Sequence, residues 1–234
     1  MKKITALTLL LTPLAALAQD KLVKKKISLN LTEEYHVSTT NKDQREGLYM
    51  VTDPNGSAVV RGKYDNGKKV GTWFFYNPDN KLSQQYDYNT GKLLYTDQDS
   101  GSYVKVDYSI AAPENAQVQP PVKIGGATLA FLTFFNSKDI PATILKEKTD
   151  VNVKYTISVD EAGHIADAWA DYESAGTTER KRLSVRPNSS GLLDFIPAQI
   201  NGKPVKSTVT MATTLPMDVN KQNSYNMMMS NQKQ

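Results

Sequence analysis

The sequence predicts a mainly β protein in which a sheet of stacked β-hairpins is followed by a small α+β domain. Residues 41–95 contain a repeat of 24 residues that is rich in aromatic and β-branched side chains. Hydrophobic residues make up only 39% of the chain, and Gly, Asn, Asp and Thr are plentiful, which suits short strands and turns better than a helical bundle. Residues 151–159 alternate between apolar and polar side chains, as a half-buried strand does.

Residues 1–18 have the pattern of a cleavable export signal. Lys2 and Lys3 provide a positive start, residues 4–17 are mainly apolar, and a small-x-small cleavage pattern ends at Ala18. The alternative is an uncleaved anchor, but a spanning helix needs about 20 apolar residues and this stretch is shorter. We therefore expect cleavage near Ala18, a mature chain that begins near Gln19, and a periplasmic or secreted location.

Charge and composition exclude several classes of protein. The chain has 28 Lys and Arg against 24 Asp and Glu. Removing Lys2 and Lys3 leaves 26 against 24, a net charge of +2, which is too balanced to indicate a nucleic-acid partner. The chain has no Cys, which excludes disulfides, thiolate metal sites and a lipid-anchored cysteine.

An N-terminal segment at residues 19–40 precedes the repeats. It contains a basic cluster at Lys21 and residues 24–26. We expect this cluster to be a solvated arm, with contact to an anionic membrane surface as the alternative.

The repeat keeps its period without a gap. Residues 49–56 align with residues 73–80, and Tyr64 aligns with Tyr88 in the same register. The same spacing joins further pairs: Gly47 with Gly71, Gly67 with Gly91, and Lys68 with Lys92.

Each repeat unit has the composition of a β-hairpin. Residues 53–56 (Asp-Pro-Asn-Gly) form a turn sequence, and residues 65–67 (Asp-Asn-Gly) form a second, tighter turn that joins paired strands. Short runs suited to strands lie between turns, at residues 58–64, 72–76 and 82–88. A single hairpin is marginal in water, so we expect consecutive hairpins to stack into one twisted sheet within residues 41–110.

Residues 62–76 resemble a MORN repeat, in the bacterial variant with Trp and Tyr after the second glycine. The resemblance covers about residues 44–95. It implies that the aromatic residues mostly fill the core of the sheet, and it is associated with scaffolding and, in some proteins, with membrane contact. We therefore expect packing roles rather than ligand stacking for five aromatic residues: Trp73, Phe75, Tyr76, Tyr86 and Tyr88.

Residues 103–110 alternate and are predicted to close the repeat sheet. The following residues 111–124 begin with a Pro- and Gln-rich stretch without apolar periodicity, which predicts a linker.

The elements predicted for residues 125–217 form a compact α+β domain. Residues 127–135 fit a short amphipathic helix that ends before Pro141. A hairpin follows, from strand 151–159 through a turn to strand 165–172. We expect a second helix from Thr177 or Thr178 to Arg182, limited by Pro187, and a third strand at residues 205–211 after the Asn201-Gly202 turn.

This order resembles the TonB C-terminal domain in the form common in Bacteroidetes envelope proteins. The resemblance rests on residues 120–126, on the strand and turn that end at residues 159–165, and on residues 197–205. The chain departs from the family between Arg186 and Phe195, where residues 187–191 interrupt the continuous helix that the family usually has.

The resemblance implies binding by addition of a partner's extended segment to a sheet edge. The last strand is the candidate edge, and the residues assigned to partner binding are Val205, Ser207, Val209, Met211 and Thr213. The expected partner is another envelope protein.

Catalytic signals are weak. The histidines are His36 and His164, and we expect His164 to face solvent after a tight turn. The carboxylate pairs at residues 160–161 and at Asp167 with Asp171 are interpreted as surface charges. We therefore predict no catalytic residue, cofactor or metal.

The function expected from the sequence is that of an exported, non-catalytic envelope binding or scaffold protein. The alternatives are an energy transducer of the TonB family and a carboxylate-dependent enzyme that acts on glycans. A transducer needs a retained membrane helix and a long spacer, whereas the spacer here is about 11 residues. Residues 218–234 are rich in Asn, Gln and Met, and we expect them to be disordered.

Overall fold

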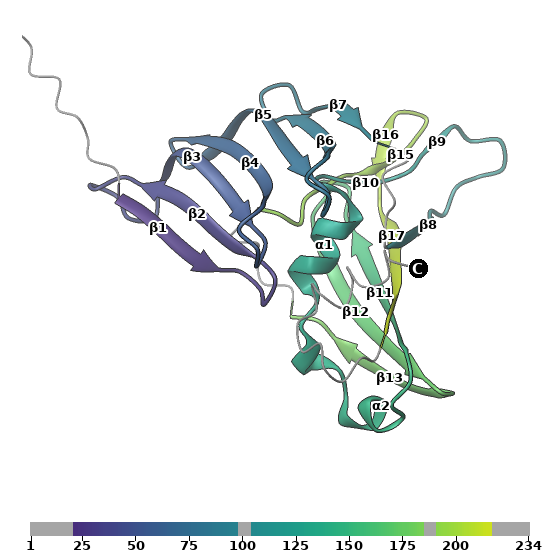
Figure 1. Ribbon diagram of the computed structural model, residues 1–234. Coiled ribbons are helices and arrows are strands. Elements are labelled where there is room, and N and C mark those ends of the chain that lie inside the picture. Colours follow the sequence, from purple (N-terminus) through teal and green to yellow (C-terminus); the bar gives the residue numbers. More distant parts are fainter. Residues whose placement is uncertain (1–20, 98–103, 185–190, 217–234) are drawn as a thin grey trace, which may run out of the picture.

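The computed structural model describes residues 21–97, 104–184 and 191–216. Within these ranges the fold is mainly β, as predicted, with two antiparallel sheets that meet at a short helix (Figure 1). The predicted export signal and the predicted disordered tail lie outside the described residues. None of the described helices is long and apolar enough to cross a membrane.

The first sheet is an antiparallel meander of seven strands in chain order. Its strands are β1 (Lys21–Lys26), β2 (Thr32–Val37), β3 (Arg45–Thr52), β4 (Ala58–Asp65), β5 (Lys68–Tyr76), β6 (Leu82–Asp87) and β7 (Lys92–Thr96). The basic cluster of residues 21–26 is not a solvated arm, because β1 pairs with β2 along its whole length. Lys24 lies opposite Glu34 there, and the two side chains form an ion pair at 2.5 Å.

The turn residues adopt the conformations that their types favour. Asn66 and Gly67 have φ angles of 50° and 77°, so they form the two-residue left-handed turn that joins β4 to β5. Gly47 and Gly71, which are 24 residues apart, have similar positive φ angles of 67° and 62°. The 24-residue spacing of the sequence repeat therefore also appears in the backbone conformation, at Gly47 of β3 and Gly71 of β5.

One face of the seven-stranded sheet carries a chain of packed aromatic rings. Trp73 is fully buried, and its ring lies 5.1 Å from Tyr49, 5.3 Å from Tyr64 and 5.2 Å from Tyr88 between centroids. A Cβ added at Gly62 would lie 2.2 Å from the Trp73 ring, so only glycine leaves room for the indole. The prediction that these aromatic residues pack inside the sheet is confirmed for Trp73 and Phe75, and half-buried Tyr86 and Tyr88 pack against this core. It is wrong for Tyr76, which lines a hollow on the opposite face.

The second sheet contains five strands in the order β13-β12-β11-β17-β8. Its strands are β8 (Lys105–Ser109), β11 (Val151–Val159), β12 (Ile165–Ser174), β13 (Thr177–Arg182) and β17 (Ser207–Leu215). The helical segments are α1 (Gly126–Phe134), the short 3-10 turn η1 (Ser137–Asp139) and α2 (Ala142–Lys146). The predicted hairpin of strands β11 and β12 is confirmed, and the five apolar positions of β11 are all buried.

Two small ladders tie the connecting segments to the C-terminal part of the chain. Their strands are β9 (Val118–Gln119), β10 (Val122–Lys123), β14 (Phe195–Ile196), β15 (Ala198–Ile200) and β16 (Lys203–Val205). β10 pairs with β14, and β15 pairs with both β9 and β16. Part of the predicted linker is therefore held in sheet structure.

Strand β8 does not close the repeat sheet, contrary to the prediction for residues 103–110. It pairs antiparallel with β17 in the second sheet, from Lys105 opposite Ala212 to Ser109 opposite Thr208. Alternation within a strand identifies its two faces but does not identify its neighbour, so the sequence pattern could not decide between the two sheets.

The predicted helix from Thr177 or Thr178 to Arg182 is wrong, because these residues form strand β13. Ala175 and Gly176 have φ angles of 47° and 83°, and they make a two-residue turn between Ser174 and Thr177. This turn returns the chain directly along β12, which leaves β-branched Thr177 and Thr178 in a strand.

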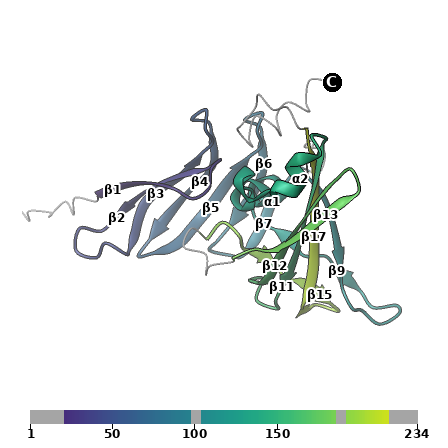
Figure 2. The same ribbon diagram turned by 90° about the horizontal axis from the view of Figure 1, so that it is seen from below.

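Helix α1 forms where predicted, but it is not amphipathic. All of its residues are buried or half-buried, and Ala130 and Phe131 have no exposed surface. The helix lies where the two sheets meet (Figure 2). Phe131 packs on Tyr155 of the second sheet, with 5.3 Å between ring centroids. On the other side, Gly125 lies against Phe75 of the first sheet, where an added Cβ would be 2.8 Å from the ring.

Polar side chains of the first sheet complete this junction. The Asn30 amide donates hydrogen bonds to the carbonyls of Leu132 and Phe135 at the end of α1, at 3.4 and 3.1 Å. Buried Gln84 donates to the Lys123 carbonyl at 3.2 Å and accepts from the Gly125 amide at 2.5 Å. The buried side chains of both sheets accordingly form one continuous apolar cluster.

We predict that Gln84→Ala destabilises the whole described unit by roughly 2–6 kcal/mol. The substitution leaves two buried backbone groups without a partner, and each such group costs about 1–3 kcal/mol. Urea unfolding followed by circular dichroism measures the change. The matched control is Gln85→Ala, whose half-buried side chain belongs to the opposite face of β6. Equal losses of stability in the two variants would contradict the role of Gln84.

Candidate functional site

The strand assigned to partner binding lies inside the second sheet. β17 pairs with β11 on one side and with β8 on the other, so the expectation that it is a free edge is wrong for residues 208–212. The side chains of Ser207, Val209 and Met211 are buried. Val205 belongs to β16 and, like Thr213, is half-buried and outside the pairing with β8.

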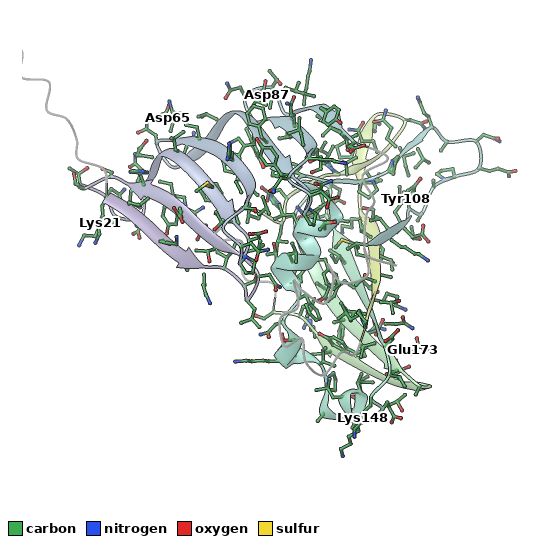
Figure 3. All side chains as sticks on the ribbon, in the orientation of Figure 1. Lys21, Asp65, Asp87, Tyr108, Lys148 and Glu173 are labelled. Carbon is green, nitrogen blue, oxygen red and sulfur yellow. The ribbon has the colours of Figure 1, made fainter. Side chains whose placement is uncertain are left out.

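The edge next to β17 is β8, and this strand is unusually open. All five of its residues are exposed, including Val106 at 52% and Tyr108 at 49%. The preceding residue, Val104, is only 1% exposed and holds the start of the strand in the core. Tyr108 lies at the outer side of the molecule in Figure 3.

A hydrogen bond shows which way the backbone of β8 points. The Leu183 amide donates to the Ala168 carbonyl, so Ala168 faces β13, and the pairing across β11 and β17 then turns Tyr108 away from β17. In keeping with this, the Tyr108 amide donates to the Asp107 carboxylate at 2.8 Å. In an antiparallel ladder the backbone groups of alternate residues point to opposite sides. The amide and carbonyl groups of Val106 and Tyr108 therefore face away from β17, toward the open side of the sheet.

The other edge of this sheet, and one edge of the first sheet, carry runs of positive charge. β13 contains Arg180, Lys181 and Arg182, and β1 carries four lysines. Lysine and arginine on edge strands oppose edge-to-edge pairing. β7, the remaining edge of the first sheet, exposes Leu94 and Tyr95. Of these four outer strands, β7 and β8 lack such basic runs.

The carboxylate pairs singled out in the sequence have structural partners. Asp167 accepts hydrogen bonds from the Trp169 indole and from Arg182, both at 2.9 Å. These two hydrogen bonds lower the pKa of Asp167 below its ordinary value. Asp171 lies 3.5 Å from Arg180 and 3.4 Å from Lys154. The pairs thus join neighbouring strands of the sheet.

The turn after β11 is stabilised by the first of its two acidic residues. The Asp160 carboxylate accepts hydrogen bonds from the amides of Ala162 and His164, at 2.9 and 2.8 Å. The amide of His164 is the largest cause of the lowered pKa of Asp160. The side chain of His164 is 70% exposed, as expected for a residue after a tight turn.

A buried charged cluster in the first sheet was not anticipated from the sequence. Glu33 is fully buried, where it accepts hydrogen bonds from Arg45 at 3.1 Å and from the Tyr49 hydroxyl at 3.0 Å. Arg45 also donates to the Tyr64 hydroxyl at 3.0 Å. Burial, followed by the charge of Glu33, raises the pKa of Tyr49. The cluster is closed from solvent, so it stabilises the sheet rather than presenting a reactive group.

Lys123 is a second buried charge that the sequence reasoning missed. Its Nζ donates to the carbonyls of Ile124 and Leu192, at 2.5 and 2.7 Å. Burial lowers the pKa of Lys123 to about 7, and the opposing effect of Asp194 is smaller. The sequence signal for this buried lysine is its position between the apolar residues Val122 and Ile124. If this stretch is buried, the lysine must be buried with it and needs hydrogen-bond acceptors.

Lys69 makes a related contact from the first sheet. Its ammonium group donates to the Gly191 carbonyl, to the Asp194 carboxylate at 2.8 Å and to the Tyr88 hydroxyl at 3.0 Å. Lys69 of the first sheet and Lys123 of β10 thus both bind the segment 191–195.

Across residues 21–97, 104–184 and 191–216, no group of three or more His, Cys, Asp or Glu side chains is placed to hold a metal ion. A scan against protein-family models gives no match for the chain. Searches of curated proteins and of solved structures give no match either.

We predict that Lys123 makes stability rise with pH above neutrality. Its pKa is about 7 in the folded chain against an ordinary value of 10.5, so between these values the unfolded chain holds the additional proton. Folding is therefore penalised fully below pH 7, and the penalty is relieved as the pH rises toward 10.5. Relative to Lys123→Met, the native chain should gain stability between pH 7 and pH 10 in urea unfolding.

The matched control for this measurement is Lys203→Met, at an exposed lysine of β16. Its stability should follow the native chain at each pH. A constant difference between the native chain and Lys123→Met across the range would show that Lys123 does not lose its proton on folding.

Proposed function

We propose that the protein is an exported, non-catalytic binding or scaffold protein of the cell envelope. In this proposal the second sheet captures an extended segment of another envelope protein by strand addition. The seven-stranded sheet acts as the scaffold to which the binding sheet is attached.

The finer description of the two sheets is part of the proposal. We infer a MORN-like array for the first sheet, supported by the 24-residue spacing of Gly47 with Gly71 and by the buried Trp73. We infer a TonB C-terminal-like unit for the second sheet, supported by the order of α1, the β11–β12 hairpin and the long final strand. The departure between Arg186 and Phe195 falls partly outside the described residues, and residues 191–194 contain no helix.

The observation that carries the binding function is the state of the β8 edge. Val106 and Tyr108 turn their backbone groups outward, and this strand has one basic residue, Lys105, instead of the basic runs found on β1 and β13. Strand addition needs such a row of backbone donors and acceptors, which supply the affinity. The binding role assigned from the sequence to the last strand therefore passes to its neighbour, β8.

Asp107 limits unwanted pairing at this edge. Its carboxylate occupies the Tyr108 amide, so an added strand must displace it to complete the ladder. A charged side chain of this kind keeps an otherwise open edge from pairing indiscriminately.

We predict that Val106→Pro abolishes capture of the partner. Proline removes the outward amide of Val106 and places its ring where the added strand would lie, while the bonds between β8 and β17 remain. The measurement is a pull-down from an envelope extract with the full mature chain, with captured proteins identified by mass spectrometry. The full mature chain is needed, because a shorter fragment of residues 120–218 would lack β8 and leave α1 uncovered.

The matched control is Val106→Ala, which keeps the amide and should retain the partner. Circular dichroism checks that both variants keep the native sheet content. If Val106→Pro captures the same partner as the native chain, strand addition at β8 is wrong.

We further predict that the exported protein begins near Gln19, because the signal pattern ends at Ala18. Mass spectrometry of the intact protein from cell fractions measures this mass directly. A chain that retains Met1 and stays with the inner membrane would contradict cleavage, and it would favour the energy-transducer alternative.

A further inference from the structure

The outer face of the seven-stranded sheet, opposite the buried aromatic rings, has an unusual composition. Leu48 on β3 is 75% exposed and Leu22 on β1 is 56% exposed. Two hollows lie on this face, with volumes of about 620 and 360 Å³. They adjoin each other, because both are lined by Leu48, Arg61 and Gly62.

Strand β4 forms the floor of this surface and contributes two cations. Arg61 and Lys63 are both exposed, and they lie two residues apart on the same face of the strand. Neither residue forms an ion pair within the described parts of the chain, and no Asp or Glu lines the larger hollow. Glu34 lines the smaller hollow, where its carboxylate is paired with Lys24. The Arg61 guanidinium instead lies 5.7 Å from the centroid of the Tyr76 ring.

Apolar residues of the neighbouring strands flank Arg61. Met50 of β3 pairs with Arg61 on one side, and Phe74 of β5 pairs with it on the other. Lys63 has the same arrangement, because it lies between Leu48 and Val70. The surface is thus a shallow groove along β4 that carries two positive charges, with apolar residues of β3 and β5 on either side of them.

The spacing of the two charges identifies the shape of a complementary ligand. Residues two apart on one face of a strand are separated by about 7 Å. An extended peptide repeats its side chains on one face at the same interval. Carboxylates at positions i and i+2 of such a peptide would therefore reach Arg61 and Lys63 together, while their aliphatic stems contact the flanking apolar residues.

We propose that this groove binds an extended acidic segment of another protein, with Asp or Glu at two positions separated by one residue. The groove is distinct from the β8 edge, which lies on the other sheet. The occupant is recognised through its side chains rather than through backbone pairing, because β4 is already paired with β3 and β5.

The geometry favours a peptide over the other anionic surfaces that a cationic apolar face could meet. The two charges follow one strand and are flanked by apolar residues of β3 and β5, which matches the path of a single chain. A lipid bilayer would present a broad surface, and Lys24 on β1 is already paired with Glu34. A second copy of this chain offers Asp171 and Glu173 at this spacing on β12, but Asp171 is already engaged by Lys154 and Arg180.

The test uses the full mature chain and a synthetic peptide with the core Glu-Val-Glu between glycines. Backbone NMR titration at low salt should show amide shifts in β3, β4 and β5. The double variant Arg61→Gln with Lys63→Gln should weaken binding about tenfold, the loss expected for two exposed ion pairs. A peptide with the core Glu-Val-Val-Glu should bind more weakly, because its carboxylates do not share one face.

The matched control variant is Arg180→Gln, which removes an exposed cation from β13 of the second sheet and should leave peptide binding unchanged. Three outcomes would overturn the proposal. The peptide shifts could fall outside β3–β5, or the double variant could bind as well as the native chain. Alternatively, the double substitution could abolish only binding to phosphatidylglycerol vesicles or self-association in ultracentrifugation. Because Val106 is unchanged in every arm, none of these results bears on strand addition at β8.

Discussion

The burial of helix α1 on all sides is the constraint on which the rest of the structure depends. Ala130 and Phe131 have no exposed surface, and no residue of the helix is fully exposed. A helix without a polar face is stable in water only where other elements cover it completely. The second sheet covers one side through Tyr155, and the first sheet covers another through Phe75. Neither sheet alone would be enough.

This constraint explains why polar residues gather at the junction. A covered helix leaves its last carbonyl groups without water, and they need partners from the covering elements. Asn30 supplies those partners for Leu132 and Phe135. Gln84 does the same for the segment that leads into the helix, through Lys123 and Gly125. These side chains specify how the sheets meet, because their hydrogen bonds are lost if either sheet shifts.

The sequence predicted elements whose signals are local. The strand 151–159 alternates within itself, and the turn at Asn66-Gly67 has the residues that a left-handed turn requires, so both were found. The turn at Ala175-Gly176 has the same backbone shape but lacks the usual Asn, and for this reason strand β13 was mistaken for a helix. The local residue types therefore explain both the correct predictions and the wrong one.

Features that depend on distant parts of the chain were not predictable in this way. The pairing of β8 with β17 joins segments about 100 residues apart, and no pattern within residues 105–109 identifies β17 as the paired strand. The candidate site moved for the same reason. Val209 and Met211 lie inside the sheet because β8 covers the edge that β17 would otherwise present. The outward direction of the Val106 backbone likewise depends on this pairing, which no local pattern encodes.

The shared core has a consequence for how the two proposed binding surfaces would act together. The β8 edge and the β4 groove belong to different sheets, yet one apolar cluster joins these sheets through α1. Their separation is therefore set by the fold rather than by a flexible linker. A partner that carries both an extended segment and an acidic segment gains from binding at the two surfaces only if its own spacing matches this fixed distance. Two individually weak contacts can then select one partner, since a protein with the right segments at the wrong spacing engages only one of them.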